Sequence, residues 1–205
     1  MATTFFITGI STEVGKTIIS AIMTQALEAD YWKPVQAGEL HNSDTHTISN
    51  LITNAKTKLH PSAFDLETPM SPHAAAAIDG IALSVKKIKR PSTKNTLVIE
   101  GAGGLLVPIN ANETMADLIK PEDKVIVVSR HYLGSINHTL LTIELLKQRK
   151  LNVFGIIFNG EEHPSTEEVI ATMTAVPILG RMDTEPYVDK NVVREYAEKW
   201  KDLLK

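Results

Sequence analysis

The sequence contains no cysteine, few aromatic residues and no long apolar run. Without cysteine the protein cannot form disulfides, thiolate zinc sites or cysteine-ligated iron–sulfur clusters, and a reducing compartment is favoured. No apolar run approaches the roughly 20 residues that span a bilayer, and no basic region precedes an apolar segment at the N-terminus. We therefore expect a cytoplasmic protein that has no membrane partner.

A strong charge of one sign is also lacking. The 21 Lys and Arg residues nearly balance the 24 Asp and Glu residues, which leaves a net charge of −3. A nucleic acid held by bulk electrostatics is therefore not expected as a partner. With 205 residues, 43% of them hydrophobic, the chain is long enough to bury one sizeable core. We expect a single domain that spans residues 1–205.

The strongest local pattern lies near the N-terminus. The apolar run Phe5–Ile7 predicts a buried strand, a short polar turn is bracketed by Gly9 and Gly15, and residues 18–27 have helical apolar spacing. Strand, glycine loop and helix in this order are typical of a phosphate-binding loop. The unpaired backbone N–H groups at the helix start and the positive end of the helix dipole both attract phosphate oxygens.

Two side chains of this loop have predicted roles. Lys16 would neutralise charge on the β and γ phosphates of a nucleotide, and the Thr17 hydroxyl would bind Mg²⁺. The loop is one residue longer than the usual Gly-x4-Gly-Lys-Ser/Thr pattern, with Ile10 at the position of the first glycine. The simpler alternative is a glycine-rich turn followed by a helix with a surface lysine.

A second lysine and an acid follow the first helix. Residues 31–38 predict a second short strand, and Lys33 stands towards its carboxyl end, where ligands bind in open parallel sheets. Lys33 could face the same phosphates as Lys16, or it could be a solvated lysine beside a proline turn. Asp44 precedes a helix predicted at residues 45–55 and is either a Mg²⁺ ligand or, like Ser43, a helix cap.

Glu100 lies at the end of another apolar run. Residues 96–99 predict a strand that is covered on both faces, and residues 101–104 form a glycine-rich loop directly after Glu100. A carboxylate in this position is suited to ordering Mg²⁺ beside a phosphate loop. An isolated acid at a strand end would more often be a surface residue, so the prediction depends on the phosphate loop.

Strands and helices alternate along the rest of the chain. Strands are predicted at 124–129, 153–158 and 176–179, and helices at 138–147, from 164 and from about 191. This alternation predicts an α/β fold, a single-domain P-loop NTPase fold with a mainly parallel sheet and helices on both faces. The turn at residues 134–137 opens a helix and is a candidate site for a substrate carboxylate, although simple capping explains it equally well.

Six motifs in this order are similar to those of the dethiobiotin synthetase family, and the resemblance extends from Thr8 to about Asn159. The motifs are Thr12–Thr17, Lys33-Pro34-Val35-x-x-Gly38, Asn42–Asp44, Ser71–His73, Glu100–Gly104 and Leu133-Gly134-x-Ile136-Asn137-His138. The family shares the longer glycine spacing. The resemblance implies an ATP- and Mg²⁺-dependent ligase of biotin biosynthesis that closes the ureido ring of dethiobiotin from CO₂ and 7,8-diaminononanoate (7,8-diaminopelargonate).

The resemblance also implies a reaction sequence. One substrate amine takes up CO₂ as a carbamate, the carbamate oxygen attacks the γ-phosphate of ATP, and the second amine attacks the resulting mixed anhydride. Phosphate is released, and no protein nucleophile is required. The sequence offers no nucleophile that stands out, so catalysis would consist of positioning and charge stabilisation.

Residue roles follow from the resemblance in four groups. The implied Mg²⁺ ligands are Thr17, Asp44 and Glu100. The implied catalytic residues are Lys16 and Lys33, which flank the carbamate and the γ-phosphate, and Thr12, which contacts the diamine. The implied nucleotide-binding residues are Glu13, Val14, Gly15, Lys16, Thr17, Ile18, Asp44, Glu100, Gly101, Ala102, Gly103, Asn159 and Gly160. The implied substrate-binding residues are Thr12, Lys33, Ala37, Gly134, Ser135, Ile136 and Asn137. The last four would receive the substrate carboxylate, which in this family lies near the partner subunit, so the resemblance implies a homodimer.

The sequence departs from the family pattern at three places. Ile10 and Ser11 replace a Thr and an Asp that are common ahead of the loop, Ala37 replaces a hydroxyl residue, and residues 180–183 replace a Gly-x-Ile-Pro segment. Two other readings stay open: another P-loop amidoligase, or a partitioning or septum-placing switch ATPase. The switch class usually carries a second lysine early in the loop, which this sequence lacks, so the ligase is the favoured hypothesis.

Overall fold

The computed structural model describes residues 2–204. The strands are β1 (Thr4–Gly9), β2 (Asp30–Trp32), β3 (Val35–Ala37), β4 (Leu59–His60), β5 (Phe64–Leu66), β6 (Leu97–Gly104), β7 (Lys124–Arg130), β8 (Asn152–Asn159) and β9 (Ile178–Met182). The α-helices are α1 (Lys16–Leu27), α2 (Asp44–Leu51), α3 (Pro72–Ile78), α4 (Ser135–Gln148), α5 (Pro164–Thr174) and α6 (Lys190–Trp200). Short 3₁₀ helices lie at Leu40–Asn42, Val85–Lys87 and Met115–Leu118.

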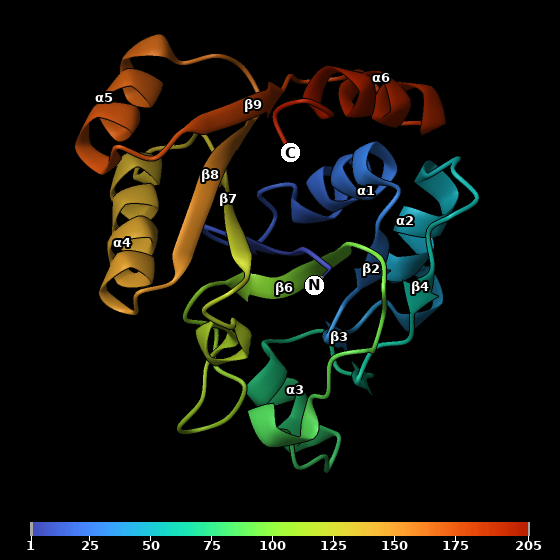
Figure 1. Cartoon of the computed structure of the whole chain (residues 1–205). Helices are drawn as coiled ribbons and strands as arrows, with labels where there is room; N and C mark the ends of the chain where they lie inside the picture. Colours follow the sequence, from blue (N-terminus) through green and yellow to red (C-terminus); the bar gives the residue numbers. More distant parts are fainter. Residues whose placement is uncertain (1, 205) are drawn as a thin grey trace.

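Seven strands form one parallel sheet in the order β4-β2-β6-β1-β7-β8-β9. Helices α1, α2 and α6 pack together on one side, whereas on the other α4 packs against β7 and β8 and α5 packs against α4 (Figure 1). The sequence predicted this parallel α/β architecture, and the structure confirms it. Because parallel strands point the same way, the segments that follow β1, β2 and β6 meet at one edge of the sheet.

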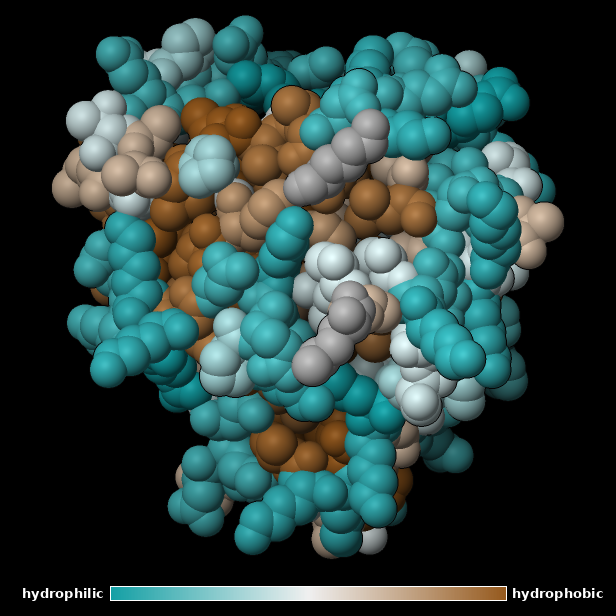
Figure 2. Space-filling model, in the orientation of Figure 1, coloured by the Kyte–Doolittle hydropathy of each residue, from teal (hydrophilic) through white to brown (hydrophobic). Residues whose placement is uncertain are grey.

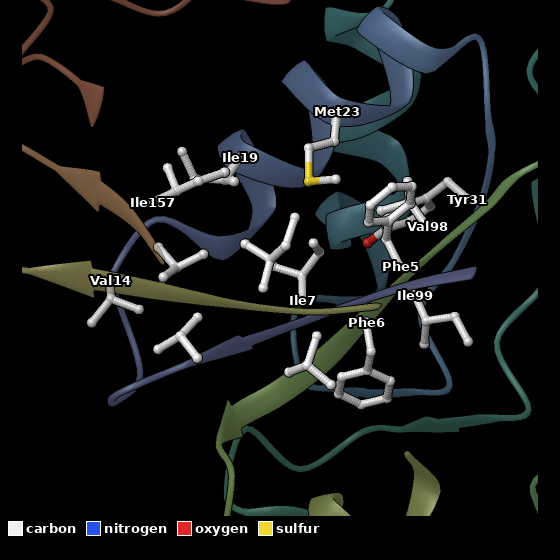
Figure 3. Close-up of a cluster of buried hydrophobic side chains, with 14 of the residues drawn as sticks. Phe5, Phe6, Ile7, Val14, Ile19, Met23, Tyr31, Val98, Ile99 and Ile157 are labelled. Carbon is white, nitrogen blue, oxygen red and sulfur yellow. The ribbon is translucent and has the colours of Figure 1, made fainter. Parts of the chain in front are cut away.

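The core lies on both faces of the central strand β1. Phe5 and Ile7 point towards α1, whereas Phe6 and Ile99 point to the opposite face (Figure 3). Each of these four side chains is at most 2% exposed. A strand buried on both faces is expected to be a continuous apolar run, which explains why the sequence does not alternate here.

The segment predicted as one strand at residues 31–38 forms two strands in different sheets. β2 belongs to the large sheet, and β3 pairs with β5 in a separate two-stranded sheet. Pro34 lies between them and has no N–H group for a sheet ladder, so the chain leaves the large sheet at this point. The prediction of a single strand was therefore wrong, and Lys33 directly follows the end of β2.

Other element boundaries differ from the sequence prediction. β6 continues through the glycine-rich stretch to Gly104, which pairs with Gly9, so the loop predicted after Glu100 is part of a strand. Helix α2 ends at Leu51 and not near residue 55. The short strands β4 and β5 were not predicted, because two or three residues carry no detectable periodicity.

Most of the surface in Figure 2 is hydrophilic, with apolar side chains gathered over β8 and β9 between α5 and α6. Ile178, at the start of the edge strand β9, is 41% exposed. Across residues 2–204, none of the helices has the length and apolar character needed to cross a bilayer.

Candidate active site

The glycine loop connects β1 to α1 as predicted. Gly15 precedes the first residue of α1 with a φ of 95°, in the left-handed region that favours glycine. A Cβ atom at Gly9 would lie 2.6 Å from Cγ2 of Val14, so the tight loop also requires glycine there. The Lys16 ammonium folds back and donates to the Ser11 carbonyl at 3.1 Å. Burial lowers the pKa of Lys16 to about 8.

Asn159, at the end of β8, supports the loop from the side. Its side-chain amide donates to the Val14 carbonyl at 3.0 Å, and a Cβ atom at Gly15 would collide with that amide. Gly160 follows with a φ of 106° and donates its N–H to the Met182 carbonyl. The strand end that carries Asn159 therefore contacts the phosphate loop directly.

Four polar side chains converge beside the loop. The Thr17 hydroxyl lies 2.7 Å from Oδ1 of Asp44 and 2.9 Å from Oε1 of Glu100. The Lys33 ammonium lies 2.6 Å from Oδ2 of Asp44 and 2.9 Å from Oε1 of Glu100. The side chains of Lys33 and Glu100 are 7% and 1% exposed, and that of Asp44 is 27% exposed. The structure thus brings Lys33 together with the three residues that the sequence analysis assigned to Mg²⁺, whereas Lys16, the other predicted lysine, donates to Ser11.

The charges in this cluster stabilise one another. Burial alone would lower the pKa of Lys33, but Glu100 and Asp44 outweigh it and raise that pKa above its ordinary value. Burial alone would raise the pKa of Asp44, but the Lys33 charge and hydrogen bond hold that pKa below its ordinary value. Lys33 is therefore a buried ammonium, which excludes the alternative of a solvated surface lysine.

The oxygen atoms of this cluster suit Mg²⁺. One hydroxyl and two carboxylates, from Thr17, Asp44 and Glu100, present oxygen atoms within hydrogen-bond distance of one another. Residues 2–204 contain no group of three His, Cys, Asp or Glu side chains that could enclose a metal by themselves. Mg²⁺ commonly binds through one or two carboxylates and completes its shell with water and substrate phosphates, so the donors fit that ion.

The start of α2 shows which of Ser43 and Asp44 caps the helix, a question that the sequence left open. Ser43 caps the helix, since its hydroxyl accepts from the backbone N–H of His46 at 3.3 Å. Asp44 is the first helical residue, and its carboxylate points to Lys33 and Thr17. Ser43 is thus the cap, and Asp44 belongs to the polar cluster.

Two polar residues of the site were missed by the sequence analysis. The Tyr31 hydroxyl donates to Oε2 of Glu100 at 2.9 Å, and Oε1 of Gln36 accepts from the Asp44 N–H at 3.3 Å. Burial, followed by the Glu100 charge, raises the pKa of Tyr31 well above its ordinary value. No sequence signal marked Tyr31, because a tyrosine in an apolar strand is ordinarily a core residue.

A cavity of about 1040 Å³ opens beside the cluster. Its wall includes Thr12, Lys33, Ala37 and Asp44, and Ala102 and Gly103 line it from β6. The lining also includes Met70, Ser71, Pro72, Leu106, His138 and Leu141. The cavity is therefore large enough for a metabolite, and Lys33 lies in its wall, whereas Lys16 does not line it.

The predicted carboxylate site lies outside the lining of this cavity. Gly134 precedes α4 with a φ of 103°, and Ser135 is buried. His138, Leu141 and Thr142 of the same helix line the cavity, whereas residues 134–137 do not. Leu133, just before the turn, is fully exposed.

The fold resembles solved structures of partitioning and septum-placing ATPases. The septum site-determining protein MinD from Pyrococcus horikoshii, in complex with Mg-ADP, matches 98% of this chain and 90% of its own with a TM-score of 0.60 and 16% identity. The pNOB8 ParA protein bound to nonspecific DNA matches 100% and 99% of the two chains with a TM-score of 0.61 and 8% identity. At such identities the likeness shows the P-loop NTPase fold alone.

Proteins of similar sequence identify the family more specifically than the fold does. Residues 3–192 match the model of a family described as AAA domain. The ATP-dependent dethiobiotin synthetase BioD of Christiangramia forsetii is 60% identical over 204 residues, which cover 100% of this chain and 99% of the relative. The protein of the same name from Cytophaga hutchinsonii is 49% identical over 95% of both chains. The chain therefore belongs to the dethiobiotin synthetase family.

Proposed function

We propose that the chain is an ATP-dependent ligase of biotin biosynthesis that closes the ureido ring of dethiobiotin from 7,8-diaminononanoate and CO₂. The observation that carries the proposal is the pairing of Lys33 with Asp44 and Glu100 beside the phosphate loop, at the wall of a cavity that also holds Thr12. Full-length relatives named for this activity support it.

The geometry supports a reaction by positioning. A nucleotide held by the backbone of residues 13–18 would present its γ-phosphate to Lys16 and Lys33. One amine of the diamine and CO₂ would form a carbamate and release a proton. The carbamate oxygen would then attack the γ-phosphorus and displace ADP. The second amine would attack the carbonyl carbon of the anhydride, which closes the ring and releases phosphate.

Each group in the cluster has a defined task in this scheme. The two lysines stabilise the negative charge that builds up on the carbamate and the transferred phosphoryl group. Mg²⁺, held by Thr17, Asp44 and Glu100, would supply charge neutralisation on the nucleotide phosphates. Thr12 would contact the diamine, and Ala37, which has no hydroxyl, would leave any polar contact there to the backbone or water.

The remaining substrate contacts are proposed on position. Ala102 and Gly103 line the cavity next to the loop, and Asn159 with Gly160 would contact the adenine. Residues 134–137 would receive the substrate carboxylate at the start of α4. Because these residues lie outside the cavity lining, the carboxylate would reach them beyond the cavity of a single protomer.

We also propose a homodimer built around the start of α4. Four apolar side chains there are exposed although apolar residues of this size favour burial: Tyr132 at 40%, Leu133 at 104%, Ile136 at 36% and Leu141 at 61%. Leu141 also lines the cavity, so a second copy seated on this face would lie next to the substrate. The patch supports a second subunit near the proposed carboxylate site.

The switch ATPase reading is not favoured. Its only support is a fold shared at low sequence identity, which does not determine function. Relatives that are 42–60% identical over at least 95% of this chain are named as dethiobiotin synthetases.

The test is phosphate release from ATP with Mg²⁺ and bicarbonate, measured with and without 7,8-diaminononanoate while dethiobiotin is followed by mass. We expect phosphate release to depend on the diamine and to match the dethiobiotin formed. Hydrolysis of ATP that is indifferent to the diamine, without dethiobiotin, would overturn the ligase assignment. A Lys33→Met variant provides the matched negative control, since it retains the phosphate loop.

A further inference from the structure

Tyr31 lies in the core, on the strand next to Glu100. β2 pairs with β6 in parallel, with Tyr31 opposite Val98, so Glu100 lies two residues further along the neighbouring strand. Figure 3 shows Tyr31 beside Phe5 and Val98 in the apolar layer under α1. The Tyr31 side chain is fully buried, and its hydroxyl donates to Oε2 of Glu100 at 2.9 Å.

The two oxygens of Glu100 have separate partners. Oε1 accepts from the Thr17 hydroxyl and the Lys33 ammonium, both at 2.9 Å. Oε2 faces the core and is held by Tyr31. We propose that Tyr31 is a positioning residue, which fixes the carboxylate of Glu100 so that Oε1 faces the proposed metal and phosphate site. The inference rests on the proposed Mg²⁺ role of Glu100.

The need for such a partner follows from burial. Glu100 is 1% exposed, so water does not reach Oε2 if Tyr31 is absent. A buried carboxylate oxygen without a donor is unfavourable, and the carboxylate would rotate to relieve it. That rotation moves Oε1 away from the position that Thr17 and Lys33 share. Residues that orient a metal ligand in this way typically change metal affinity by about 10–100-fold when they are replaced.

The neighbouring residue of β2 shows that this bond is specific to Tyr31. The Trp32 indole donates to the Pro61 carbonyl at 3.1 Å, away from Glu100. A phenylalanine at position 31 would fill nearly the same volume, so Tyr31→Phe removes the hydroxyl and little else. Tyr196→Phe is the matched control, because Tyr196 is also a buried tyrosine but donates to Glu185 at 2.7 Å.

The experiment measures Mn²⁺ binding by electron paramagnetic resonance in the presence of ADP, on the full chain. We expect the Mn²⁺ affinity to fall about 10–100-fold in Tyr31→Phe and to stay within about 2-fold of wild type in Tyr196→Phe. The Mg²⁺ concentration for half-maximal turnover should rise by the same factor. Unchanged Mn²⁺ affinity in a folded Tyr31→Phe protein, as judged by circular dichroism, would overturn the proposal.

A double-variant cycle with Glu100→Gln tests whether Tyr31 acts through Glu100. If it does, Tyr31→Phe should cause no further loss of Mn²⁺ affinity in the Glu100→Gln background, whereas independent effects would multiply and refute the inference. Mn²⁺ binding does not require the ligase reaction. If wild type binds Mn²⁺ and ADP but forms no dethiobiotin, the proposed function fails while the positioning role is still tested.

Discussion

Replacing Lys33 by methionine isolates the charge at the centre of the cluster. Methionine retains an unbranched apolar stem, so the substitution chiefly removes the ammonium. In wild type that ammonium lies 2.6 Å from Asp44 and 2.9 Å from Glu100, with exposures of 7%, 27% and 1% for the three side chains. The variant leaves two carboxylates side by side without the cation that bridges them.

The structure sets the magnitude of the effect. Removing one partner of a buried ion pair costs about 3–5 kcal/mol, because the remaining charge stays buried without compensation. Asp44 is partly exposed, so water screens its carboxylate and we expect the lower end, about 3 kcal/mol. A domain with about 5–15 kcal/mol of stability still folds after this loss, and its urea midpoint falls by about 1–2 M.

The loss of folding stability in Lys33→Met should depend on pH. Lys33 and its hydrogen bond hold the folded-state pKa of Asp44 below its ordinary value of 3.8. This contribution is fully present above the unfolded pKa and is lost as the pH falls through the folded pKa. The difference in stability between wild type and Lys33→Met is therefore largest near neutral pH and shrinks below about pH 4 as Asp44 takes up a proton.

Urea unfolding and dethiobiotin formation provide the assay. Product formation should fall about 10²–10³-fold, as for loss of one group that stabilises developing charge. Lys56→Met is the control, because Lys56 pairs with Glu28 at 2.5 Å but the two side chains are 70% and 47% exposed. An exposed pair contributes about 0–1 kcal/mol. A Lys33→Met midpoint equal to that of Lys56→Met, or near-normal turnover, would refute the role assigned to Lys33.

Three further predictions concern the rest of the site. Gly134→Ala, at a φ of 103°, adds about 1–3 kcal/mol of strain and should raise the KM for the diamine more than that for ATP in steady-state assays. Asn159→Ala removes the hydrogen bond to the Val14 carbonyl and should weaken the binding of an ATP analogue about 3–10-fold, as measured by calorimetry. An affinity equal to that of wild type would contradict this prediction. Leu133→Asp should convert a sedimenting dimer to monomer, whereas Met173→Asp on α5 should not.

Much of the fold was predictable because its central strands are continuous apolar runs. The runs ending at Ile7, Ile99 and Ser129 each became a strand of the parallel sheet. The division at Pro34 was not predicted, since the residues on both sides have strand character and only the missing N–H of proline ends the ladder. β4 and β5 form because neighbouring strands provide their hydrogen bonds, and the chain itself carries no periodic signal for them.

The residues of the cluster were predictable, but their mutual geometry was not. Spacing placed Lys33 and Glu100 at strand ends, and the family resemblance assigned their roles. Their contact depends on β2 lying next to β6, a strand order that the sequence pattern does not encode. The same adjacency brings Tyr31 to Glu100, which is why a residue with no motif of its own belongs to the site.

The site is assembled from parts of the chain that meet only in the finished sheet. Thr17 and Glu100 are 83 residues apart in sequence, and Lys33 and Glu100 are 67 apart. Because Glu100 is carried by β6, which lies between β2 and β1, Glu100 joins the other two groups only when that strand is in place. A nucleotide or metal held by the cluster must then stabilise the sheet as a whole, since unfolding of β6 alone would remove the site.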